Sequence, residues 1–335
     1  MRAVLLHKVG EQFQVEQVPD PAPPPNGAVV RLEAAALNHR DEFIRVGLYS
    51  KIQLPAVLGS DGAGVVESVA PGVDSSWLGR KVVINPCDGW GPDPRAQDSK
   101  TFLIRGMPKQ GTFAEKIALP LDRLEPMPEH LSWPEAAALP LAGLTAYRAL
   151  VTRGEVKKGE HVLVTGIGGG VATVVLLLAQ ALGAQVSVTS GSEEKLRRAR
   201  SMGAIAAVSY KNKGWEKVLA QQAGRPPSLV IDSAGGADFA ALLNGVAPGG
   251  RIVSYGATLG PPEKLELTRI FFKQIDMRGT TMGTDEEFRA MLRLVARERL
   301  RPIVDHVFPL SQAAEADRRL AQSEQMGKIV LNCRA

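Results

Sequence analysis

The chain contains few of the residues that stabilise secreted and metal-rich domains. Only two of its 335 residues are cysteines, Cys87 and Cys333. A framework of several disulfides is therefore excluded, and so is a structural zinc lobe built from four cysteines. We expect each cysteine to be an isolated thiol.

The sequence also lacks the segments that direct a protein to membranes or to nucleic acids. It has no run of about 18 apolar residues, which a membrane-spanning helix needs, and residues 1–17 lack the apolar core of a signal peptide. Lys and Arg exceed Asp and Glu by 40 to 35, but these cations are scattered, and no basic block contains interleaved aromatics. We therefore expect a cytoplasmic protein with no membrane or nucleic-acid partner, whose excess positive charge suits a small anion such as a nucleotide phosphate.

What the sequence does have is a glycine cluster between a strand and a helix. Residues 162–165 are a short β-branched run, and an apolar segment rich in Ala and Leu follows the cluster as far as Gly183. Such a turn brings the amides of a helix N-terminus to a phosphate, and its glycines let the backbone approach a pyrophosphate. A second strand at 185–189 completes the context for dinucleotide binding. The residues of the turn are Gly166, Gly168, Gly169, Gly170 and Val171, the last of which replaces the third glycine of the strict pattern.

The composition changes along the chain indicate two domains. Residues 1–120 contain several short strand-like runs separated by Pro and Gly, which is typical of a compact barrel-like domain. In residues 121–264 buried strands alternate with helices, which predicts a doubly wound parallel sheet. Residues 265–335 end in a strand at 328–331, and we expect this part to complete the first domain.

Several motifs together resemble the medium-chain dehydrogenase/reductase superfamily. They lie at residues 59–66, 111–115, 136–147 and 327–331, and the resemblance covers nearly the whole chain. It implies an α/β protein with a GroES-like β-rich catalytic domain and a Rossmann domain for the cofactor. It also implies a homodimer in which residues 276–283 form the edge strand that pairs between subunits.

The positions where the chain departs from this resemblance bear on the chemistry. Zinc-dependent members carry Cys where this chain has Asn38, and His-Glu where it has Ser60-Asp61. Asn and Ser are poor ligands for catalytic zinc, which prefers thiolate, imidazole or carboxylate. The chain thus resembles the zinc-independent quinone oxidoreductase-like branch, which implies hydride transfer from NADPH to a quinone, an enone or a related small molecule. Two alternatives stay open, a zinc-type alcohol dehydrogenase with atypical ligands and a non-catalytic NADPH-binding protein.

The second strand of the nucleotide domain ends without the acid that binds the ribose of NAD. Ser190 stands there, so no carboxylate repels the 2′-phosphate of NADPH. The resemblance adds Lys195 near the adenosine ribose, Tyr210 near the 2′-phosphate and Thr145 near the nicotinamide, and we include Lys328 of the closing strand among the cofactor-binding candidates. The alternatives are a solvated helix face for Lys195 and simple packing for Tyr210.

Without a metal, hydrogen-bond donors must stabilise the negative charge that develops on the carbonyl oxygen. The candidate catalytic residues are Asn38, Arg40, Tyr49 and Ser60. Tyr49 could also give a proton or merely pack in its loop, and Arg40 could reach a cofactor phosphate. A quinone or an enone spreads the developing charge over a conjugated system, so a few donors suffice for it.

Overall fold

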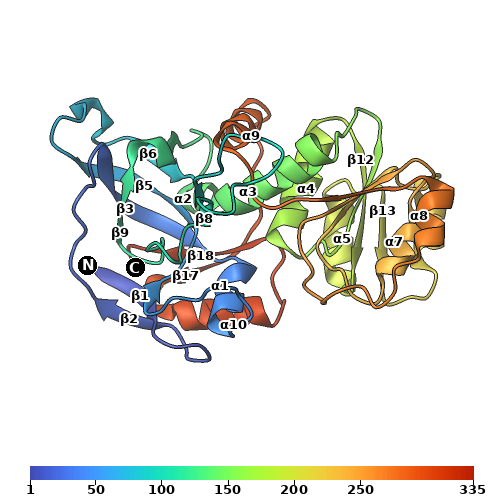
Figure 1. Ribbon diagram of the computed structural model, residues 1–335, viewed down its shortest axis with the longest axis horizontal. Coiled ribbons are helices and arrows are strands. Elements are labelled where there is room, and N and C mark those ends of the chain that lie inside the picture. Colours follow the sequence, from blue (N-terminus) through green and yellow to red (C-terminus); the bar gives the residue numbers. More distant parts are fainter. The chain divides into compact units, whose positions relative to one another are not determined.

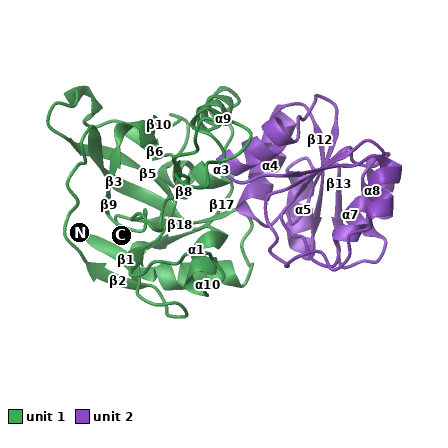
Figure 2. Cartoon of the chain, in the orientation of Figure 1, with its two compact units in different colours: residues 1–142, 283–335 green, residues 143–282 purple.

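The computed structural model describes all residues, Met1–Ala335, and divides into two compact units (Figure 2). Unit 1 comprises Met1–Ala142 and Gly283–Ala335, and unit 2 comprises Gly143–Met282. The chain therefore leaves unit 1 and returns to it. Both crossings lie later in the chain than the expected boundaries at residues 120 and 264.

Backbone pairing explains the positions of these crossings. Strand β10 (Leu124–Pro126) pairs with β6 (Lys81–Ile84), and this keeps the segment after residue 120 in unit 1. Strand β16 (Asp276–Gly279) pairs with β15 (Arg251–Ser254), so the segment after residue 264 belongs to unit 2. Short strands such as β10 carry too little periodic signal for the sequence to place them.

Unit 1 is built mainly on antiparallel strands (Figure 1). Its seven-stranded sheet has the order β10-β6-β5-β3-β18-β17, with β9 also paired to β3, and smaller sheets have the orders β2-β1-β4 and β7-β8. The remaining strands are β1 (Arg2–Leu6), β2 (Gln14–Gln17), β3 (Gly27–Ala36), β4 (Ala56–Val57), β5 (Asp61–Val69), β7 (Cys87–Asp88), β8 (Leu103–Ile104), β9 (Lys116–Pro120), β17 (Val304–Pro309) and β18 (Lys328–Asn332). The helices are α1 (His39–Arg45), α2 (Trp133–Ala137), α9 (Asp285–Arg297) and α10 (Ala313–Ala321), and α3 (Pro140–Tyr147) contains the crossing into unit 2.

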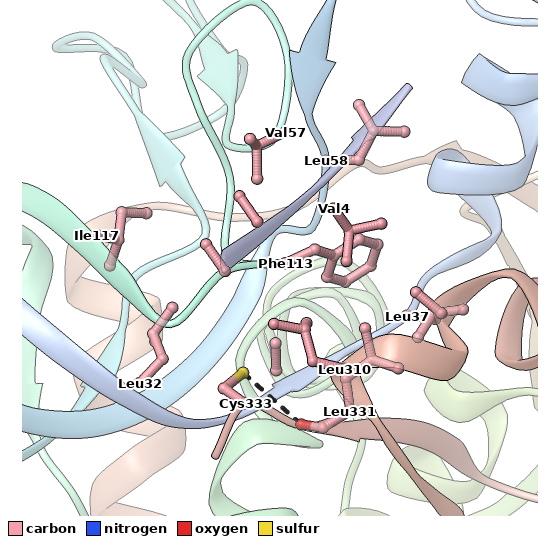
Figure 3. Close-up of a cluster of buried hydrophobic side chains, with 14 of the residues drawn as sticks. Val4, Leu32, Leu37, Val57, Leu58, Phe113, Ile117, Leu310, Leu331 and Cys333 are labelled. Carbon is pink, nitrogen blue, oxygen red and sulfur yellow. Dashed lines mark hydrogen bonds between the residues drawn. The ribbon is translucent and has the colours of Figure 1, made fainter. Parts of the chain in front are cut away.

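The core of unit 1 joins the two ends of the chain. Figure 3 shows Val4, Phe113, Leu310 and Leu331 among the buried side chains that gather there from distant parts of the sequence. Strand β18 pairs antiparallel with β3, so the C-terminal segment is an integral part of the first sheet. The same core buries Cys333, and burial raises the pKa of its thiol, which keeps it in the unreactive protonated form.

Unit 2 is a six-stranded parallel sheet with the order β13-β12-β11-β14-β15-β16. This is the strand order of the doubly wound dinucleotide-binding fold, so the expected fold class is confirmed. All residues of β11 are buried, as in a parallel strand covered on both faces. The elements not yet given are β11 (His161–Val164), β12 (Gln185–Ser190), β13 (Ala206–Ser209), β14 (Leu229–Asp232), α4 (Gly170–Ala181), α5 (Glu193–Ser201), α6 (Trp215–Ala223), α7 (Phe239–Gly245) and α8 (Leu267–Lys273).

Local signals in the sequence place several helix ends. Ser132 and Glu135 form a capping box at α2, and Thr284 and Glu287 form another at α9, because each pair satisfies backbone amides that the first helical turn leaves free. None of the helices is both long enough and apolar enough to cross a membrane.

Candidate functional site

A capping interaction at the start of α1 organises the polar interior of unit 1. The amide of Asn38 donates to Oδ2 of Asp41 at 2.8 Å, and the amide of Gly59 donates to Oδ1 of the same carboxyl at 3.3 Å. Asp41 is fully buried, and this burial raises its pKa to about 6, against the opposing influence of Arg40. Asp41 thus connects the start of α1 to the segment that precedes Ser60 and Asp61.

A buried lysine lies beside this cap. The ammonium of Lys328 donates to the carbonyl of Leu37 at 2.6 Å, to Oδ1 of Asn38 at 2.6 Å and to Oδ2 of Asp61 at 2.9 Å. Nδ2 of Asn38 donates to the same Asp61 oxygen at 3.0 Å, and the amide of Leu141 donates to Oδ1 at 2.7 Å. We call Lys328, Asn38 and Asp61 the Lys328 cluster; its side chains are at most 8% exposed.

The Lys328 cluster does not fit a zinc ion. Nowhere in the structure do three His, Cys, Asp or Glu side chains come together as metal ligands. Within the cluster the only ionisable acid, Asp61, already bears an ammonium ion on Oδ2 and a backbone amide on Oδ1. The cation that balances this carboxylate is therefore supplied by the chain itself.

Arg40 and Ser60 form the next layer of the polar interior. Nη1 of Arg40 donates to the carbonyl of Arg105 at 2.7 Å and to Oγ of Ser60 at 3.1 Å, and the Ser60 hydroxyl donates to the same carbonyl at 2.7 Å. Ser60 is fully buried and its one proton is engaged, so in this geometry it positions Arg40. The Tyr49 ring lies under the guanidinium, with its centroid 5.1 Å from Cζ.

In unit 2 the glycine turn after β11 is open. Gly166 has a φ of 63°, in the left-handed region that favours glycine, and a Cβ added there would meet nothing within 4 Å. Gly169 is the N-cap of α4, so the first amides of this helix have no partner within the helix and can bind an anion. Gly166, Gly168, Gly169, Gly170 and Val171 are all partly exposed.

A buried pair fixes the turn to the neighbouring strand. The Thr165 hydroxyl donates to Oδ1 of Asp232 at 2.6 Å, and the amides of Ala234 and Gly235 donate to the same carboxylate at 3.2 Å each. Asp232 therefore holds together the loops that follow β11 and β14. We did not identify this pair from the sequence, because its two members are 67 residues apart.

At the end of β12 the structure brings Ser190 and Tyr210 together. A Cβ added to Gly191 would lie 2.6 Å from the Tyr210 hydroxyl and 3.0 Å from Cε of Lys211. Gly191 thus leaves the space that the Tyr210 and Lys211 side chains occupy. Ser190 accepts a hydrogen bond from the amide of Ser192 at 3.2 Å, and Ser192 caps α5, the helix that carries Lys195.

The predicted site residues thus fall into two groups. Asn38, Arg40, Tyr49 and Ser60 lie in unit 1, and the cofactor candidates lie in unit 2, apart from Lys328. Thr145 is buried on α3, with its hydroxyl 3.8 Å from Sδ of Met282. Lys328 uses all three N–H donors within unit 1, which associates it with the catalytic candidates.

Comparisons with known proteins agree with this division. The family model for the alcohol dehydrogenase GroES-like domain matches residues 24–129, and the model for zinc-binding dehydrogenases matches residues 170–297. The zinc-type alcohol dehydrogenase-like protein YogA of Leptosphaeria maculans is 39% identical, over 95% of this chain and 94% of its own. A quinone oxidoreductase of Pseudomonas aeruginosa is 32% identical over 92% of each chain.

A solved structure shows the same fold over the full length. The crystal structure of an NAD-dependent alcohol dehydrogenase matches with a TM-score of 0.94 and 39% identity, over 99% of each chain. These relatives and the two matched domains make the protein an oxidoreductase of an NAD(P)-dependent family. The chain belongs to the medium-chain dehydrogenase/reductase superfamily.

Proposed function

We propose that this protein reduces a quinone, an enone or a related activated carbonyl compound with NADPH and without a catalytic metal. The observation that carries the proposal is the Lys328 cluster. In it the Lys328 ammonium ion, bonded to Asn38 and Asp61, provides the positive charge that balances the buried Asp61 carboxylate. The reduction consumes NADPH and one proton and yields the reduced substrate and NADP⁺.

Unit 2 offers the groups that would hold NADPH. The open glycine turn and the first amides of α4 would bind the pyrophosphate. Ser190, Tyr210, Lys211 and Lys195 would bind the 2′-phosphate, because hydroxyls and ammonium groups suit a dianion and no carboxylate stands at the end of β12. When bound, NADPH supplies the hydride.

Unit 1 offers donors for the oxygen that becomes negative. The Asn38 amide has one N–H in use towards Asp61 and keeps a second, and the Tyr49 phenol could donate a hydrogen bond or a proton. One well-placed donor is worth about 2.7–4 kcal/mol in acyl-transfer enzymes. Two such donors suit a conjugated electrophile, whose charge is already delocalised, better than a simple ketone.

A substrate panel tests this proposal. Purified protein is assayed with NADPH and with NADH against quinones, enones, aldehydes and ketones. We expect saturable turnover of a quinone or an enone, with kcat/KM for NADPH well above that for NADH. Equal use of the two cofactors would contradict the proposed binding of the 2′-phosphate beside Ser190. NADPH binding without turnover of any compound would favour the non-catalytic alternative.

We also propose that the protein is a homodimer. Strand β16 is an edge strand, paired only with β15, and exposed edges invite pairing with another chain. Phe271 and Phe272 on α8 are 61% and 75% exposed, and Met277 on β16 is 43% exposed, which supplies apolar surface for such an interface. Light scattering should give twice the mass of the chain, and a monomer mass would refute the dimer.

A further inference from the structure

The Arg40 guanidinium is buried, and three of its five N–H donors, those of Nε and Nη2, have no partner. Arg40 is 8% exposed, and Nη1 makes both of its hydrogen bonds, to Ser60 and to the Arg105 carbonyl. Nε and Nη2 are buried and have no partner. Such donors are costly to leave unpaired, which makes them candidates for a ligand.

The two unpaired nitrogens, Nε and Nη2, can together donate hydrogen bonds to both oxygens of one carboxylate. The Nε–H group and one N–H group of Nη2 point from the same edge of the planar guanidinium. Two parallel donors of this kind match the two oxygens of a carboxylate. Cζ of Arg40 lies over the Tyr49 ring, 5.1 Å from the ring centroid.

The charges around Arg40 point to the same ligand class. Lys328 is paired with Asp61 at 2.9 Å, and Arg105 is paired with Asp88 at 2.9 Å. The nearest carboxylate to Arg40 is Asp41, 3.9 Å from Nη1, and the Asp41 oxygens accept the amides of Asn38 and Gly59. Among these three cations, Arg40 alone lacks a hydrogen-bonded carboxylate.

We infer that Arg40 binds a carboxylate of the substrate through Nε and Nη2, so that the preferred substrates are enones or quinones that carry a carboxylate. This inference rests on the proposed reductase function for the reaction itself, but the carboxylate site can be tested without it. A carboxylate must displace a neighbouring side chain to reach the buried edge. Tyr49 is the side chain that would have to move, because it lies beside the guanidinium and belongs to residues 46–55, which contain no helix or strand.

The test compares a carboxylate with its methyl ester. Calorimetry measures binding of 4-oxopentanoate and of methyl 4-oxopentanoate to the full chain, and steady-state kinetics with NADPH compare 4-oxopent-2-enoate with its methyl ester. We expect the carboxylate to be preferred by about 10–100-fold in Kd and in kcat/KM, as charge-assisted hydrogen bonds predict. Arg40→Met should reduce both preferences to about one, and Arg40→Lys, which keeps the charge without the paired donors, should give an intermediate preference. Arg297→Met, at an exposed position on α9, is the matched control and should keep the wild-type preference.

The two readouts separate this inference from the proposed function. Carboxylate binding that depends on Arg40, without turnover of either enone, would support the carboxylate site and reject the reductase. Turnover of both enones without a preference in the wild-type protein would support the reductase and overturn the carboxylate site. An undiminished preference in a folded Arg40→Met variant would also overturn it, and the wild-type comparison stands even if a variant fails to fold.

Discussion

Replacing Lys328 with methionine should lower the free energy of unfolding by about 3–5 kcal/mol, because it leaves the Asp61 carboxylate buried without its cation. Asp61 is fully buried, and the ammonium lies 2.9 Å from Oδ2. Urea denaturation measures the loss. In the fraction that remains folded, kcat/KM for the best quinone or enone should fall about 100-fold, since Asn38 loses the bond that orients its amide and small misplacements are this costly.

A second substitution distinguishes charge from packing in this cluster. Lys328→Met combined with Asp61→Asn should recover a large part of the lost stability, because the unpaired charge is then gone and the two effects are not additive. Lys8→Met, at an exposed position, should leave stability unchanged. Additive losses in the double variant would show that Lys328 acts mainly through its packing.

Placing a carboxylate at the end of β12 should reverse the cofactor preference. Ser190→Asp should lower kcat/KM for NADPH about 100-fold, because like charges brought together cost several kcal/mol, while the value for NADH should be maintained or rise. The Ser192 amide, which now donates to Ser190, can donate to the new carboxylate. Steady-state kinetics with each cofactor and one fixed substrate give the ratio.

The matched control is Ser201→Asp, which adds the same charge to the same unit at the exposed end of α5. Its NADPH to NADH ratio should equal that of the wild type. If Ser190→Asp leaves the ratio unchanged, the 2′-phosphate does not bind at the end of β12, and Tyr210 and Lys211 have another role.

The sequence predicts the elements with strong periodic or capping signals. The strand, glycine turn and helix of unit 2 lie where the residues place them, and so do the capping boxes at α2 and α9, because these features depend on neighbours within a few residues. Four apolar residues recur at helical spacing in the sequence and are all buried on α9: Phe288, Met291, Leu292 and Val295.

Contacts between distant segments could not be predicted in the same way. Lys328 and Asp61 are separated by 267 positions, so nothing local in the sequence brings Lys328 to Asn38 and Asp61 rather than to the cofactor candidates. The segment 85–111 is polar and rich in Gly and Pro, yet Trp90 and Arg105 are buried within it, because Trp90 packs edge-on against Phe102 and Arg105 pairs with Asp88. The need for glycine at position 191 likewise depends on distant residues, because a Cβ there would contact the Tyr210 and Lys211 side chains.

Metal content measured together with activity tests most directly whether the proposed reduction proceeds without zinc. The purified protein is dialysed against a strong chelator, its zinc is quantified, and kcat/KM with NADPH is measured before and after. We predict far less than one zinc ion per chain and a kcat/KM that chelation leaves unchanged, because Lys328 provides the cation for Asp61. One zinc ion per chain, with activity that is lost on chelation and restored by zinc, would contradict the metal-free reductase.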